Sequence, residues 1–193
     1  MAQTKPLIYV STDIETNGPH IGKNSILSLA SAAFLENKTL VSTFTVNLDT
    51  LPDGEENPVT MAWWKQFPEA WAAARQQCIS PKIGMANYVN WLNQLPGRPI
   101  FVGYPVAFDY SYVVYYLERF TSENPFGFAA IDLRSLMMGL QRTSFSKSSK
   151  QHWPVEWFED KPHTHVALDD AIEQGTVFCN MLAEFQNNKP LSD

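Results

Sequence analysis

Five residues spread along the chain are of the types that metal-assisted hydrolysis requires. Asp13 and Glu15 lie in Ser-Thr-Asp-Ile-Glu-Thr-Asn-Gly, Asp109 lies in Val-Ala-Phe-Asp-Tyr, and His165 and Asp170 lie in His-Val-Ala-Leu-Asp-Asp-Ala. Gathering carboxylates in one place is unfavourable unless a cation neutralises them. Because these acidic residues lie at the ends of apolar runs, we expect the fold to bring them together around hard metal ions. The chemistry that this arrangement favours is hydrolysis of a phosphodiester.

The spacing within each segment supports a shared site. Side chains two residues apart on a strand point to the same face, so Asp13 and Glu15 can face one ion. Asp109 and Asp170 open helical patterns and can reach that site from neighbouring elements. Mg²⁺ prefers oxygen ligands, and four carboxylates can hold two Mg²⁺ or Mn²⁺ ions about 3.5–4 Å apart. His165, with an ordinary pKa of about 6.5, is the natural general base.

The elements that must position these residues follow from hydrophobic periodicity. Three strands come first, the second and third joined by a hairpin turn at residues 36–38, and two more strands then alternate with helices. This order predicts an α/β fold with a mixed five-stranded sheet and helices on both faces. We expect strands over 6–14, 25–36, 39–48, 99–104 and 127–133, and helices over 60–77, 81–95, 108–120, 134–141 and 166–186.

Local sequence signals predict where one helix begins and divides, and which segment forms a loop. Thr60 is a candidate N-cap for the helix over 60–77, and Pro68 is a point at which that helix can divide. The Ser- and Lys-rich segment 143–152 is expected to be a mobile loop. We expect one domain over residues 1–187, followed by a short tail over 188–193.

The three acidic segments, in this order and at these distances, resemble the motifs of the DEDDh 3′→5′ exonucleases. That family includes the DnaQ-like proofreading subunits, ribonuclease T and oligoribonuclease, and the resemblance covers residues 7–186. It implies a ribonuclease H-like fold and two-metal hydrolysis from a 3′ end. Family members often carry a polar pair such as His-Asn where this chain has Tyr104-Pro105. The resemblance assigns metal binding to Asp13, Glu15, Asp109 and Asp170, and the role of base to His165.

Several assignments have a competing interpretation. Asp109 could instead be a helix N-cap. Asp169 competes with Asp170, and His163 competes with His165. A spacing of five residues between histidine and aspartate favours His165 and Asp170, and Asp169 then points about 100° away around the helix.

Substrate contacts are expected within or beside the same motifs. Trp63, Trp64 and Trp71 have the spacing of a helix core, and base stacking by Trp63 or Trp64 is the alternative. Arg142, Lys147 and Lys150 form either a solvated loop or a lid that grips phosphate. The residues that we expect to contact substrate are Thr16, Asn17, Trp64, Phe108 and His163.

Composition restricts the partners and the compartment. The chain has 193 residues, 45% of them hydrophobic, and a net charge of −6, which argues against a large non-specific DNA-binding surface. Single-stranded RNA or DNA 3′ ends are the expected substrates, with nucleoside 5′-monophosphates as products. No apolar stretch is long enough to span a membrane, and the two cysteines fit free thiols in the cytoplasm. The chain could form a homodimer. The alternative to the exonuclease function is a non-catalytic nucleic-acid-binding or polymerase-associated module of the same fold.

Overall fold

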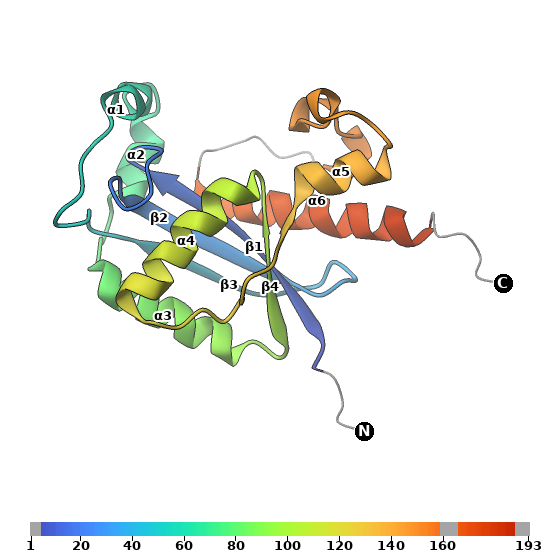
Figure 1. The fold of residues 1–193 in the computed structure, drawn as a ribbon, viewed down its shortest axis with the longest axis horizontal. Helices are drawn as coiled ribbons and strands as arrows, with labels where there is room; N and C mark the ends of the chain where they lie inside the picture. The colour runs from blue at the N-terminus through green and yellow to red at the C-terminus, as the bar shows by residue number, and fades with distance from the viewer. Residues whose placement is uncertain (1–4, 159–165, 188–193) are drawn as a thin grey trace.

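The computed structural model describes residues 5–158 and 166–187, which form a central five-stranded sheet with helices packed on it (Figure 1). The strand order is β3-β2-β1-β4-β5. β1 pairs antiparallel with β2 and parallel with β4, so the sheet is mixed. The predicted fold class, a ribonuclease H-like mixed sheet, is confirmed. The strands are β1 (Leu7–Thr16), β2 (Ile26–Phe34), β3 (Leu40–Asn47), β4 (Arg98–Gly103) and β5 (Ala130–Asp132).

Helices cover both faces of the sheet. α3 and α4 lie on one face, and the long α6 runs across the other face (Figure 1). α1 and α2 form a lobe at one end of the molecule, and α5 with three short 3₁₀ turns forms a second lobe (Figure 1). The helices are α1 (Pro58–Trp64), α2 (Pro68–Ala74), α3 (Pro81–Gln94), α4 (Val106–Phe120), α5 (Leu133–Leu140) and α6 (Ala167–Asn187); the turns are η1 (Phe145–Lys147), η2 (Lys150–His152) and η3 (Val155–Trp157).

The centre strand β1 separates two hydrophobic cores. Ile8, Val10 and Ile14 point into the core under α3 and α4, whereas Tyr9 packs into the core under α6. A central strand buried on both faces needs a continuous apolar run, which is what the sequence shows here. Because side chains alternate, Ser11, Asp13 and Glu15 follow Tyr9 onto the α6 side.

Helix boundaries differ from the predicted ones for local reasons. Asn57, not Thr60, is the N-cap of α1, and its side chain accepts from the amides of Val59 and Thr60. Pro58 and Pro68 each open a helix, where the missing amide hydrogen costs nothing, so the predicted division at Pro68 is confirmed. The predicted turn at residues 36–38 is also present between β2 and β3.

The segment over 143–152 is better packed than expected for a mobile loop. It contains η1 and η2, and the Ser148 side chain is fully buried. Arg134 of α5 donates from Nε to Ser148 Oγ at 3.2 Å and from Nη2 to the Phe145 carbonyl at 2.9 Å. These contacts hold the segment against α5. The Ser- and Lys-rich composition, on which the expectation of a mobile loop was based, does not reveal them.

Three further expectations concern features outside the sheet. Within the described residues, no helix is long and apolar enough to cross a membrane. Cys179 is a buried free thiol and Cys78 a half-buried one. The proposed tail over 188–193 lies outside the described residues.

Candidate active site

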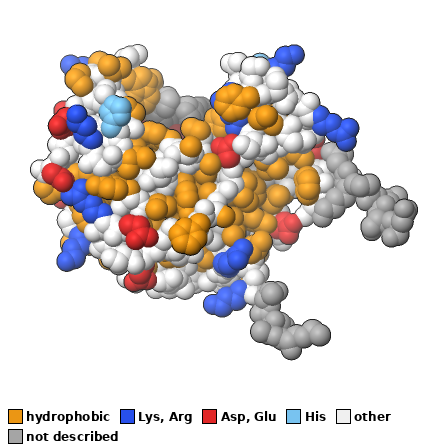
Figure 2. All heavy atoms as spheres, viewed as in Figure 1, with side chains coloured by type: hydrophobic (Ala, Val, Ile, Leu, Met, Phe, Trp, Pro, Cys, Tyr) orange, Lys and Arg blue, Asp and Glu red, His pale blue; other side chains and the backbone are white. Residues whose placement is uncertain are grey.

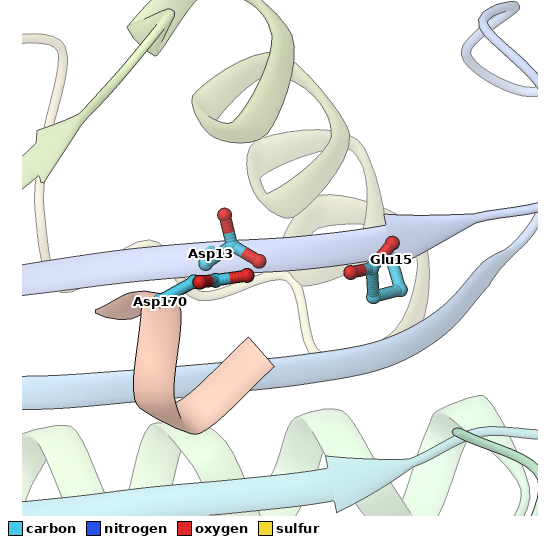
Figure 3. Close-up of side chains that lie close together, drawn as sticks. All are labelled: Asp13, Glu15 and Asp170. Atoms are coloured by element: carbon cyan, nitrogen blue, oxygen red, sulfur yellow. The ribbon is translucent and has the colours of Figure 1, made fainter. Parts of the chain in front are cut away.

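Three carboxylates meet where α6 crosses the middle of the sheet. Asp13 and Glu15 project from the same face of β1, and Asp170 reaches them from the first turn of α6 (Figure 3). One carboxylate oxygen from each residue lies within 4.8 Å of the other two. Asp169 is exposed, so the structure brings Asp170 rather than Asp169 to this cluster. Three oxygen ligands at this spacing suit a hard divalent cation.

Asp109 approaches the cluster from the opposite side of the sheet. It lies in the first turn of α4, three residues beyond the first helical residue, and is therefore not the N-cap; Pro105 occupies that position. Its side chain is only 4% exposed. The negative charge of Asp109 raises the pKa of Asp13, which places the two carboxylates within electrostatic reach. A role for Asp109 as a metal ligand stays a prediction.

Burial and mutual repulsion make the cluster costly to ionise. Burial raises the pKa of Asp13 well above its usual range, and the charges of Asp109, Glu15 and Asp170 raise it further. Burial, followed by the charge of Asp170, raises the pKa of Glu15 to about 8. A divalent cation reverses this effect because it favours the charged form of each carboxylate. The donor set and its electrostatics therefore fit a bound metal ion.

The helix that carries Asp170 is held against β1 by close contacts one turn farther along. Gln174 donates from Nε2 to Ser11 Oγ at 2.9 Å and to the Thr12 carbonyl at 3.2 Å. At Gly175, an added Cβ would lie 2.3 Å from the Phe34 ring and 3.0 Å from Ser11 Cβ. No side chain larger than hydrogen fits there, so Gly175 allows α6 to approach the sheet closely.

The carboxylates form the floor of an open cleft of about 560 Å³. Trp63 of α1 lines one side of this cleft, and Lys150 of η2 lines the other. Figure 2 shows the molecule hollowed between the lobe of α1 and α2 and the lobe of α5 and the 3₁₀ turns. The described residues that line the cleft are Asp13, Ile14, Glu15, Trp63, Tyr104, Lys150, Asp170, Glu173 and Gln174.

Three of the predicted substrate contacts are buried and hydrogen-bonded within the fold. Asn17 is 1% exposed, and its Oδ1 accepts from the Ser25 amide at 2.6 Å. Thr16 is buried and donates from Oγ1 to the Gly18 carbonyl. Trp64 is 2% exposed and donates from Nε1 to the Thr16 carbonyl at 3.0 Å. Their assignment as substrate contacts stays a prediction, and these hydrogen bonds show that their polar groups already have partners at the turn that follows β1.

The remaining predicted substrate contacts are Phe108, which the structure describes, and His163, which lies outside the described residues. Phe108 is half-buried, packs on Tyr112 with ring centroids 5.1 Å apart, and does not line the cleft. His163 and His165 lie outside the described residues, so their roles stay predictions. His20 and His152 are exposed, as expected.

Two cleft residues could have been found from helical spacing. Glu173 and Gln174 follow Asp170 by three and four positions, so they share its face of α6. Tyr104 precedes the second motif and lines the cleft directly. The three acidic motifs by themselves assign no role to these neighbours.

Residues 9–182 match the family described as the Rv2179c-like 3′-5′ exoribonuclease domain. The chain belongs to this family, and it is thereby a 3′–5′ exonuclease, a hydrolase that acts on nucleic acid. The chain is also 30% identical over 186 residues to the 3′-5′ DNA exonuclease Cap18 of Escherichia coli, covering 91% of this chain and 92% of that protein.

Solved structures share the fold at low sequence identity. The nuclease domain of 3′hExo, a DEDDh family member bound to rAMP, superposes with a TM-score of 0.65 at 11% identity, covering 95% of this chain and 94% of that one. The zinc-bound complex of Escherichia coli ExoI with single-stranded DNA gives a TM-score of 0.67 at 15% identity, covering 96% of this chain and 42% of that one.

The raised pKa of Glu15 predicts how stability depends on pH without a divalent ion. Between its usual value and about 8, the folded protein retains a proton that the unfolded chain releases. The free energy of unfolding should therefore fall as pH rises from about 5 to about 8, by less than about 1.4 kcal/mol per pH unit for one group. Thermal unfolding in chelator across this range measures the slope.

The control variants separate Glu15 from the rest of the protein. Glu15→Gln should flatten the slope, whereas Glu69→Gln, at an exposed position on α2, should leave it unchanged. Millimolar Mg²⁺ or Mn²⁺ should also flatten it in the unmodified protein. Equal slopes for Glu15→Gln and the unmodified protein would contradict this account of the cluster.

Proposed function

We propose that this protein hydrolyses single-stranded or 3′-overhanging nucleic acid from the 3′ end and releases nucleoside 5′-monophosphates. The observation that carries the proposal is the cluster of Asp13, Glu15 and Asp170 at the floor of an open cleft. Figure 2 shows the hollow between the two lobes, and the three carboxylates line the open cleft there. The matched family carries an RNA activity in its description and the Escherichia coli relative a DNA activity, so the proposal covers both sugars.

The four carboxylates and His165 have different roles in the proposed reaction. Asp13, Glu15, Asp109 and Asp170 would hold two Mg²⁺ or Mn²⁺ ions, which when bound supply charge stabilisation and an activated water. Asp13 and Glu15 lie two residues apart on β1 and keep their relative placement because both are paired with β2. His165 accepts the proton of the attacking water. The single domain over residues 1–187 is the catalytic unit in this proposal.

Removing a carboxylate of the cluster should abolish hydrolysis. Loss of one ligand forfeits several kcal/mol of transition-state stabilisation, so Asp13→Ala and Asp170→Ala should each lower the rate by about 1,000-fold or more. Asp169→Ala, at the exposed neighbouring position, should retain the rate within about twofold. The measurement is a gel time course with 5′-labelled single-stranded RNA and DNA of one sequence in Mg²⁺, Mn²⁺ or chelator.

The pattern of products decides between hydrolysis and binding alone. A metal-dependent ladder that shortens from the 3′ end supports the proposal, and the faster polymer identifies the preferred sugar. Full turnover by Asp170→Ala would refute the metal assignment. Binding of both strands by the unmodified protein without any shortening would favour a non-catalytic nucleic-acid-binding module.

The base assignment predicts a pH-dependent rate. His165 must be neutral to accept a proton, so the turnover rate should rise between about pH 6 and pH 8. His165→Ala should lower turnover by about 100- to 10,000-fold. His163→Ala should keep the rise. If the variant at position 165 also lost the metal-induced rise in melting temperature, His165 would be a ligand and not the base.

Trp63 is the aromatic residue best placed to stack on a substrate base. It lines the cleft, and its ring packs 5.0 Å from the buried Trp64 ring and 4.7 Å from Phe67. Base–aromatic stacking contributes about 1–3 kcal/mol per base, so Trp63→Leu should raise KM by about tenfold. Trp71→Leu, in the same aromatic cluster but outside the cleft lining, should leave KM unchanged. An equal effect of both variants would indicate a packing role.

A further inference from the structure

The charges that line the cleft are arranged unevenly. Asp13, Glu15 and Asp170 occupy its floor, and Glu173 extends the acidic surface along α6. Among the described residues that line the cleft, Lys150 is the sole cation. A nucleic-acid strand brings one negative charge per phosphate into this acidic surface, so a positive side chain at the rim has a defined electrostatic role.

Lys150 is held by its backbone at the edge of the cleft and pairs with Glu173 through its ammonium. Its amide donates to Tyr104 Oη at 3.1 Å, and the Tyr104 ring packs against Trp153 with centroids 4.9 Å apart. These contacts fix η2 at the edge of the cleft. The ammonium pairs with the carboxylate of Glu173 and lies 5.7 Å from the centre of the Phe158 ring. The Lys150 side chain remains 39% exposed, whereas that of Glu173 is 18% exposed.

The Lys150 ammonium also reaches the catalytic carboxylates electrostatically. Its charge lowers the pKa of Asp13, in opposition to the stronger effects of burial and of the neighbouring acids. The ammonium thus acts on the carboxylates of the cleft while its side chain stays partly exposed to solvent. A lysine ammonium is a compact charge on a flexible stem, so it can exchange one anionic partner for another with small side-chain movements.

We propose that Lys150 binds a backbone phosphate of the substrate strand and that Glu173 holds the ammonium ready at the rim of the cleft. This inference rests on the proposed function, because it takes a single strand as the ligand. The phosphate shares or replaces the contact with Glu173 as the strand enters. Lys150 is thus a binding residue, and Glu173 is a positioning residue for it.

The test measures binding and its dependence on salt. Fluorescence anisotropy with a 5′-labelled single-stranded 10-mer in Ca²⁺, from 25 to 200 mM KCl, gives Kd and the slope of log Kd against log salt concentration. Loss of one phosphate contact on a single strand lowers that slope by about 0.7. Lys150→Met should therefore reduce the slope by about 0.7 and raise Kd by about tenfold at low salt.

Matched variants distinguish a phosphate contact from a general charge effect. Lys147→Met removes an exposed lysine from the neighbouring turn η1 and should leave the slope unchanged. Lys150→Arg should retain most of the affinity. Glu173→Gln removes the contact that positions the ammonium and should raise Kd by less than Lys150→Met does, with the slope unchanged.

The same binding and stability measurements can overturn the assignment of Lys150 as a phosphate contact. If the Lys150–Glu173 pair only fastens η2 to α6, Lys150→Met and Glu173→Gln will weaken binding equally and lower the melting temperature equally, with no change in slope. A ladder from the unmodified protein in Mg²⁺, together with an unchanged slope in Lys150→Met, would refute this inference and leave the exonuclease standing. A reduced slope without any ladder would support the phosphate contact and refute the proposed hydrolysis.

Discussion

The close packing of α6 on β1 is the contact on which the site depends. Gly175 lets the helix backbone approach Phe34 and Ser11, and Gln174 ties it to β1 through Ser11 and the Thr12 carbonyl. Asp170 lies one turn before these contacts, so its distance from Asp13 is set by helix geometry and not by a loop. A rigid strand and a rigid helix thus place carboxylates that come from opposite ends of the chain.

This packing works against the electrostatics of the residues that it assembles. Asp13 and Glu15 have raised pKa values because they are desolvated and close to other acids, and the fold supplies no cation on the floor of the cleft from its described residues. Burial of apolar side chains in the two cores on either side of β1 provides the free energy that holds the acids together. A bound divalent ion would remove the repulsion, which couples stability to metal binding.

The sequence predicted the parts of the site that depend on periodicity and order. Alternation along β1 placed Asp13 and Glu15 on one face, and the spacing at the start of α6 selected Asp170 over Asp169, as the structure shows. Sequence reasoning did not foresee the contacts of Asn17 and Trp64, because their partners are distant in sequence or across a turn: Trp64 donates to a carbonyl 48 positions away. Tertiary contacts of this kind leave no local pattern.

An acidic protein can still bind a polyanion if its few cations are placed where the polymer runs. The chain has 20 acidic and 14 basic side chains, and this composition argues against a broad basic surface. Lys150 is fixed by Tyr104 at the rim, and Trp63 offers a sequence-independent stacking surface on the opposite wall. Recognition would then depend on one strand end at a time, because these two contacts and the carboxylate floor converge within a single cleft. Such an arrangement would disfavour long-range attraction to duplex nucleic acid and would still allow short-range contacts with a free strand end.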